Sequence, residues 1–432
     1  MNFRFRQIEE KDRYTMNMIE KIMAKRSGRR KVTPGDVVVC EVDCALLHDL
    51  SARSCRIVFE KQVGGKMAHP ERIVTVIDHQ FSPPTEEKAA ILVAIRDFSW
   101  KNNMPLYDCG SGNIHNVALQ MGHIRPGDLV VGSDSHSPVQ GVMGAFCASL
   151  GNDSYAATVM PYSKSWFKVP ETVRIEVTGK TRPGVTPRDV ALWLCAEIGE
   201  GRVNYQAVKF CGEYLESLPF WDRYLFPLMG VDIGAKCAYI DPDKTTTDFA
   251  DSVGCKGYEV ERDDPGTKFV ETWSYDISKL EPQICFPATV GNVAPISEYA
   301  GTPINWAELG GHGGGRLTDV EQAAQVLRKK SKHGHVNFNI VPGSRHVFSE
   351  AVKSGALAAL HQGGATWFPA STGANQAVNM GAMAAGETMI STHVRNFPGR
   401  NGSPKAQMFL ASALSVAAAA TAGKITDPRE FL

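Results

Sequence analysis

Residues 110–137 read GSGNIHNVALQMGHIRPGDLVVGSDSHS, and this stretch indicates the fold class most directly. Its run Asp128–Val131 has the apolar, β-branched composition of a buried strand. Asp134, Ser135 and His136 follow that run within a few residues. Because α/β sheets bind their ligands at the ends of buried strands, the stretch predicts such a sheet with a functional site at its edge.

The chain on both sides of this stretch alternates between strand and helix patterns, as α/β proteins do. Strands are indicated by β-branched runs, and helices by capping residues, an early proline or a closing glycine. The patterns predict strands at residues 37–40, 72–77 and 172–177, and helices at residues 85–100, from Thr186-Pro187 onward and at residues 406–422, before Gly423.

The length of 432 residues is enough for two to three domains. The pattern changes near residue 166, and proline and glycine accumulate at residues 285–305. We therefore expect three α/β domains, at residues 1–165, 166–290 and 291–432.

Composition excludes several classes of partner. Lys and Arg total 46 and Asp and Glu total 46, so no net charge favours nucleic acid or an anionic membrane. No apolar segment is long enough to span a bilayer, and the first residues lack the apolar core of a signal peptide. We expect a cytoplasmic protein. In that setting the ten scattered cysteines are best interpreted as small buried hydrophobic residues.

Carboxylates, imidazoles and guanidinium groups form the candidate site. A carboxylate beside an imidazole orients the ring and holds its protonation state, which a general acid needs. Two arginines five residues apart in a glycine-containing loop are suited to binding carboxylates through paired hydrogen bonds. Taken alone, an Asp-His pair more often caps a structural element. The candidates are Asp78, His79, His115, Asp134, Ser135, His136, Arg395 and Arg400.

The order and wording of several blocks give these residues a context. The blocks KRSGRRKVTPGDVVVCEVDCALLHDL, VIDHQFSP, WFKVPETVRIEVTGK and GKITDPREFL, together with residues 110–137, resemble the large subunit of 3-isopropylmalate dehydratase and homoaconitase, in the aconitase superfamily. The resemblance implies the aconitase-like three-domain α/β/α architecture with mixed sheets. It also implies a small carboxylate substrate, and a separate small subunit with the swivel domain and a serine base.

The resemblance also implies roles for particular residues. It places the catalytic acid pair on Asp78 and His79 and further active-site residues on His115 and the Asp134–His136 segment. It places the arginines that bind substrate carboxylates on Arg395 and Arg400.

The chain departs from this family at the positions that hold a [4Fe–4S] cluster. No cysteine follows Cys285, and the blocks GGHGGGR and PASTGANQAVNMG put His312, Thr372 and Asn375 where the family has its three cluster cysteines. Thiolates are the usual ligands of such clusters, so we expect no [4Fe–4S] cluster. His393-Val394 and Lys209 also replace residues that the family places near its cluster.

We therefore expect a cluster-independent lyase or isomerase of a small di- or tricarboxylate. The candidate reactions are hydration or dehydration, double-bond isomerisation, and elimination or decarboxylation, driven by acid/base catalysis. Lys209 either holds a substrate carboxylate in place of iron or points to solvent.

Two alternatives stay open. One is a hydro-lyase with a single divalent metal, for which His312 is the leading ligand and His79, His115, His136 and His393 are further donors. The other is a non-catalytic paralogue that binds a carboxylate or a partner chain, against which the retained acid and arginines argue.

Overall fold

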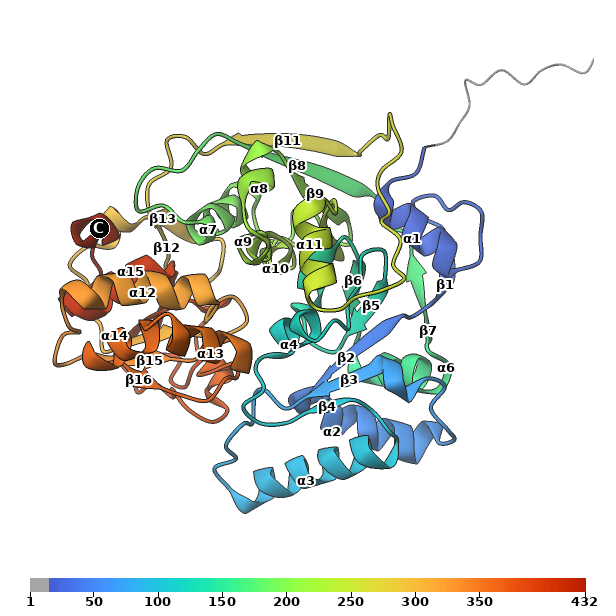
Figure 1. Cartoon of the computed structure of the whole chain (residues 1–432), viewed down its shortest axis with the longest axis horizontal. Coiled ribbons are helices and arrows are strands. Elements are labelled where there is room, and N and C mark those ends of the chain that lie inside the picture. The colour runs from blue at the N-terminus through green and yellow to red at the C-terminus, as the bar shows by residue number, and fades with distance from the viewer. Residues whose placement is uncertain (1–14) are drawn as a thin grey trace, which may run out of the picture.

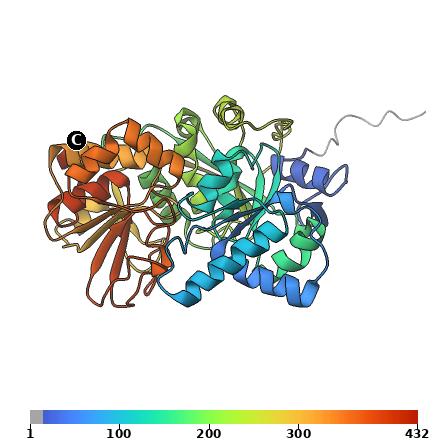
Figure 2. The ribbon, with the colours of Figure 1, turned by 60° about the horizontal axis from the view of Figure 1, so that its bottom comes forward.

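The computed structural model describes residues 15–432, which form three larger β-sheets and one two-stranded ribbon, with helices around them (Figure 1). In both views the C-terminal third, orange to red, lies at one side of the molecule and the N-terminal segments, blue, lie at the other (Figures 1 and 2). The predicted α/β class is confirmed. None of the helices in the described part of the chain is long and apolar enough to cross a membrane.

The first sheet is entirely parallel, with the strand order β4-β3-β2-β5-β6. Parallel strands end at the same edge of a sheet, so the loops after β2, β3 and β5 meet there. A separate antiparallel ribbon joins β1 to β7. The strands are β1 (Val37–Glu41), β2 (Cys44–His48), β3 (Ile73–Val76), β4 (Leu106–Tyr107), β5 (Leu129–Gly132), β6 (Phe146–Ser149) and β7 (Lys164–Lys168). The main helices are α1 (Met18–Arg26), α2 (Asp49–Val58), α3 (Glu86–Lys101) and α4 (Ile114–Gln120).

The second sheet is also entirely parallel, in the order β10-β9-β8-β11. Its strands are β8 (Thr172–Thr178), β9 (Ala207–Cys211), β10 (Cys237–Ile240) and β11 (Glu271–Asp276). Its helices are α7 (Pro187–Ile198), α8 (Glu213–Ser217), α9 (Phe220–Arg223), α10 (Leu225–Gly230) and α11 (Lys244–Ser252).

The third sheet is mixed, in the order β13-β12-β18-β17-β14-β15-β16, because β12 is antiparallel to both of its neighbours. Its strands are β12 (Gln283–Cys285), β13 (Val293–Pro295), β14 (Trp306–Leu309), β15 (Asn337–Ile340), β16 (Thr366–Trp367), β17 (Thr388–Ser391) and β18 (Gln407–Ala411). Its helices are α12 (Leu317–Lys329), α13 (Arg345–Lys353), α14 (Ala356–Gln362) and α15 (Ala413–Ala422).

Two features differ from the sequence-based predictions. Residues 407–411 form strand β18 rather than the first turns of a helix, and α15 begins only after the N-cap Ser412. The predicted third domain begins at residue 291, but strand β12 lies before that residue and pairs within the third sheet. Strand β7 spans the predicted limit at residue 165. The sheets therefore divide the chain a few residues away from the proposed limits 1–165, 166–290 and 291–432.

Candidate active site

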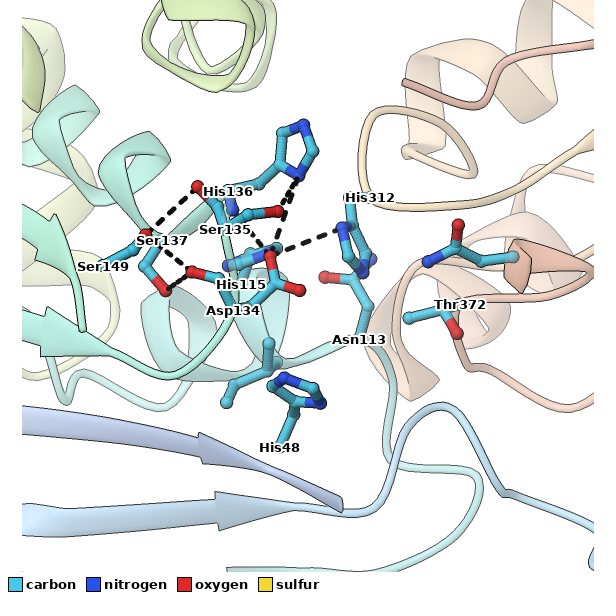
Figure 3. A network of polar contacts seen from close by, with 12 residues as sticks. His48, Asn113, His115, Asp134, Ser135, His136, Ser137, Ser149, His312 and Thr372 are labelled. Carbon is cyan, nitrogen blue, oxygen red and sulfur yellow. Dashed lines mark hydrogen bonds and ion pairs between the residues drawn. The ribbon is translucent and has the colours of Figure 1, made fainter. Parts of the chain in front are cut away.

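The carboxyl edge of the first sheet carries a cluster of histidine and carboxylate side chains. The ends of β2, β3 and β5 place His48, the Asp78-His79 pair and the Asp134–His136 segment at this edge. Loops of the third sheet approach this edge from the other side. One contact between them is the hydrogen bond from the Thr372 backbone N–H to the Asp78 carbonyl, at 3.1 Å. Figure 3 shows side chains from both parts converging on one point.

Two buried carboxylates orient the imidazole of His79. Its Nδ1 lies 2.8 Å from Asp78 Oδ1 and 3.6 Å from Asp49 Oδ1. Burial disfavours a charged ring, but these carboxylates outweigh it and raise the pKa of His79 to about 10. Among the described residues, the Nε2 of this ring meets only the amide nitrogen of Asn375, at 3.4 Å. Within residues 15–432, the proton on Nε2 therefore has no hydrogen-bond acceptor.

Asp49 and Asp78 are themselves held by backbone groups. Asp49 accepts hydrogen bonds from the backbone N–H groups of Asp78, His79 and Gln80 at 3.4, 3.1 and 2.8 Å. Asp78 Oδ2 accepts from the backbone N–H of Ile114 at 2.8 Å. These bonds fix the turn after β3 and, with it, the direction of the His79 ring.

Asp134 is the carboxylate at the centre of the cluster. Its Oδ1 lies 3.1 Å from His115 Nε2 and accepts from the backbone N–H of His136 at 2.7 Å. The Nδ1 of His312 lies 3.7 Å away, beyond an ordinary hydrogen bond (Figure 3). Burial opposes the charge, but the hydrogen bond from His115 Nε2, together with the neighbouring imidazoles, holds the pKa of Asp134 well below its usual value. The cluster therefore has an ionised carboxylate at its centre.

His312 enters the cluster from the glycine-rich loop between β14 and α12. The loop packs tightly, since a Cβ on Gly314 would lie 1.8 Å from Thr392 Oγ1, and the Tyr224 hydroxyl donates to the His312 carbonyl at 2.9 Å. Burial lowers the pKa of His312 well below its usual value, so the ring is neutral. Within residues 15–432, neither ring nitrogen has a hydrogen-bond partner. The ring centroid lies 4.9, 5.5 and 5.6 Å from those of His115, His79 and His136.

Both predicted arginines lie beside this cluster. Arg395 donates from Nε to Asp232 Oδ1 at 3.1 Å and from Nη1 to Ser135 Oγ at 3.2 Å. Arg400 is more deeply buried and donates to Asn375 Oδ1. Burial lowers the pKa of Arg400 to about 10, so its guanidinium remains charged at neutral pH. A cavity of about 290 Å³ opens beside Arg395 and Asp232, which leaves room for a small anion.

Two residues that the sequence placed near the centre have other partners. His393 Nε2 lies 2.8 Å from Glu308 Oε1, so its ring is engaged within the third sheet. The ammonium group of Lys209 donates to Asp241 at 2.5 Å and also to Asp263. Lys209 lines a separate cavity of about 570 Å³ in the second sheet. Two carboxylates therefore already neutralise the charge of Lys209, which favours a structural role over binding substrate in place of iron.

The three positions that replace the cluster cysteines meet at His79. The His312 ring packs against that of His79, Thr372 Oγ1 donates to the Asp78 carbonyl at 3.2 Å, and the Asn375 amide touches His79 Nε2. Within residues 15–432, the groups of side chains close enough to share one ion contain histidine and aspartate but no cysteine. An imidazole, a hydroxyl and an amide do not replace three thiolates, so these residues do not fit a [4Fe–4S] cluster.

Three site residues were missed in the sequence. His48 ends strand β2 and Asp49 begins helix α2 in the run CALLHDL, where the rule of polar residues at the end of a buried strand could have found them. Asp232 follows α10, and its Oδ2 lies 3.4 Å from His136 Nε2 while Oδ1 binds Arg395. No local signal marks Asp232, because both partners are distant in the sequence.

Comparisons with known proteins identify the family of this chain. Residues 20–423 match the Aconitase family (aconitate hydratase). The chain is 36% identical over 96% of its length to 3-isopropylmalate dehydratase large subunit 1 of Methanopyrus kandleri, of which it covers 99%. It is 34% identical over 96% of its length to the probable methanogen homoaconitase large subunit of Methanothermobacter thermautotrophicus, of which it covers 98%.

Among solved structures, the chain is similar to the holo-form of aconitase X of Thermococcus kodakaraensis. The TM-score is 0.49 at 14% identity, and the match covers 87% of this chain and 89% of the other. From its family match and its full-length relatives, the chain belongs to the aconitase family.

Proposed function

We propose that this protein is a cluster-independent lyase or isomerase that acts on a small di- or tricarboxylate by acid/base catalysis. One observation supports this most strongly: Asn375 joins the proposed acid to the proposed carboxylate-binding group. Its amide nitrogen lies 3.4 Å from His79 Nε2, and its amide oxygen accepts from Arg400. A substrate carboxylate on Arg400 therefore lies one side chain away from a proton donor.

His79 is the proposed general acid. Asp78 fixes the Nδ1–H, and the raised pKa keeps the Nε2 proton in place at neutral pH. A hydroxyl leaves much more readily when it departs as water, so proton transfer from Nε2 does part of the work that a Lewis acid does elsewhere. A leaving group better than hydroxide needs less assistance still, which is why elimination or decarboxylation remains within the proposal.

The arginines and the second carboxylate complete the proposed site. Asp232 and Ser135 hold Nε and Nη1 of Arg395 beside the cavity, and within the described part of the chain Nη2 makes no hydrogen bond. Two guanidinium groups suit a substrate with two carboxylates, each bound through charge-assisted hydrogen bonds. Ionised Asp134 accepts from His115 and from the His136 backbone, and so holds both residues in place beside the proposed acid.

A separate small subunit is part of the proposal. Two of the relatives described above are named as large subunits, and the resemblance assigns a swivel domain with a serine base to the other chain. Such a subunit would cover the open side of the cavity at Arg395 and supply the base that removes a carbon-bound proton.

The test uses the chain purified together with its small subunit and freed of metal by chelation. A panel of hydroxy di- and tricarboxylates and their unsaturated counterparts is incubated in D2O and followed by NMR. We expect one of them to exchange a carbon-bound proton or interconvert, with loss of at least about a hundredfold in rate in His79→Gln. The control His123→Gln removes a histidine that pairs with Tyr107 outside the cluster.

Two results would overturn the proposal. Ligand binding without turnover of any candidate would favour a non-catalytic paralogue. An undiminished rate in His79→Gln would remove His79 from the role of acid.

A further inference from the structure

The centre of the cluster contains ligand atoms that the proposed acid/base chemistry does not use. His312 is 3% exposed, and both of its ring nitrogens lack a partner within the described part of the chain. A buried polar atom without a partner costs about 1–3 kcal/mol, and a bound ion or water is a usual compensation for two such atoms in one ring. An imidazole with free nitrogens beside a carboxylate is a typical metal ligand.

We propose that His79, Asp134 and His312 bind one divalent transition-metal ion, such as Zn²⁺ or Fe²⁺. Each residue offers one ligand atom, and these atoms lie within 4.8 Å of one another, all buried. Any two donor atoms of a tetrahedral ion lie roughly 3.3 Å apart at ordinary metal–nitrogen distances. The 3.7 Å between His312 Nδ1 and Asp134 Oδ1 is close to that spacing and too long for a hydrogen bond.

The groups around these ligands resemble the outer shell of a metal site. Asp78 binds the Nδ1–H of His79 at 2.8 Å, which leaves Nε2 for the ion, and carboxylate–histidine pairs of this kind orient metal ligands. Asp134 is held by His115 and by the His136 backbone, as ligating carboxylates usually are. Two imidazoles and one carboxylate leave coordination positions open for water or a substrate oxygen, which suits Fe²⁺ or Zn²⁺ rather than Mg²⁺ or Ca²⁺.

A second acidic group nearby does not qualify as a site. Ligand atoms of His48, Asp49, Asp78 and His79 also lie within 4.8 Å of one another. Asp49, however, already accepts three backbone N–H bonds, and Asp78 accepts from His79 and from the Ile114 backbone. Both oxygens of Asp49 and of Asp78 are therefore engaged, and their role is to orient His79. The hydrogen bonds that the Asp134 side chain accepts within the described residues go to Oδ1 alone.

The test counts ions on the free chain, apart from any turnover. Metal-free protein is titrated with Zn²⁺ by calorimetry, and the metal that remains after desalting is measured by mass spectrometry. We expect one ion per chain. Asp134→Asn and His312→Asn should each weaken binding by more than about a hundredfold, since even outer-shell partners are worth about 10–100-fold. Asp78→Asn should weaken it within that outer-shell range, and His123→Gln should leave it unchanged.

Absorption of the Co²⁺-loaded protein provides a second measurement that a structural role cannot mimic. A d–d spectrum of low-symmetry coordination should appear in the native chain and disappear in both ligand variants, with thermal unfolding used to show that each variant is folded. If His312→Asn does not fold, the isosteric Asp134→Asn decides the matter. Absence of a bound ion in the native chain, or equal binding by the ligand variants and His123→Gln, would overturn the proposal.

Activity measurements with and without the ion distinguish the metal site from the proposed function. The two proposals compete because a bound ion and the acid proton would occupy the same atom, Nε2 of His79. Binding of one ion together with turnover by metal-free enzyme supports both proposals. Binding of one ion with turnover only in the loaded enzyme supports the site and overturns His79 as the acid.

Discussion

Replacing Asp78 with asparagine tests whether that carboxylate keeps His79 protonated. Asp78 Oδ1 lies 2.8 Å from His79 Nδ1, and the pair is completely shielded from solvent. Two unit charges about 4 Å apart attract by about 4 kcal/mol at the effective dielectric constant of proteins, which corresponds to nearly a thousandfold in an equilibrium constant. Asparagine still accepts the Nδ1–H bond, and Asp49 stays 3.6 Å away. We therefore expect the proton dissociation constant of His79 to rise by about a hundredfold, or about 3 kcal/mol.

NMR of chains labelled at the histidine Cε1 carbon measures this change without knowledge of the substrate. The His79 signal is assigned by its loss in His79→Gln. It should titrate near pH 10 in the native chain and at clearly lower pH in Asp78→Asn. A signal that titrates near pH 6.5 in the native chain, or at the same pH in both proteins, would refute the reasoning.

Stability gives the same prediction a second measurement. The pKa of His79 is higher in the folded chain than in the unfolded chain, so its charge stabilises the fold fully below about pH 6.5. That contribution is lost as pH rises through about 10. The thermal destabilisation of Asp78→Asn relative to the native chain should therefore be largest near pH 6 and shrink towards pH 10. A difference that does not depend on pH would contradict this account.

Three further substitutions separate binding from folding. Lys209→Met should lower the free energy of unfolding by about 2 kcal/mol, because it leaves two partly buried aspartates unpaired, and it should leave the affinity for a dicarboxylate unchanged. Weaker dicarboxylate binding in calorimetry would show instead that Lys209 belongs to the substrate site. Arg400→Gln should weaken calorimetric binding of a dicarboxylate by at least about tenfold through loss of a charge-assisted bond, with little change in unfolding temperature, whereas unaltered affinity would exclude it. Gly314→Ala should destabilise by about 1–3 kcal/mol or more in urea unfolding, since its Cβ would overlap Thr392 Oγ1, and a neutral effect would contradict the packing described for the His312 loop.

The positions of the site residues could be predicted where they follow local rules. Asp78, His79 and Asp134 come directly after buried strands, and parallel strands bring such residues to one edge. The convergence of His312 on this edge was not readable from local pattern, because it depends on how loops of the third sheet pack against the first. Resemblance to a family supplied that position, and the structure brings it beside His79.

What the sequence-based predictions missed or left open has equally specific causes. The alanine-rich pattern of residues 406–422 favours a helix, but residues 407–411 pair with β17 and β12, and tertiary pairing overrides propensity there. Lys209 has its partners 32 and 54 residues away in the sequence, at Asp241 and Asp263. Neither partner is visible in the pattern around β9, so the sequence alone left open whether this charge is free to bind substrate.

The most direct test of the central claim is the iron and acid-labile sulfide content of the protein, purified without oxygen. The account predicts no acid-labile sulfide, because His312, Thr372 and Asn375 stand where thiolates would be needed. A single metal ion per chain without sulfide agrees with both proposals. Iron and sulfide in the proportions of a [4Fe–4S] cluster would contradict the claim and make the protein an ordinary cluster-dependent dehydratase.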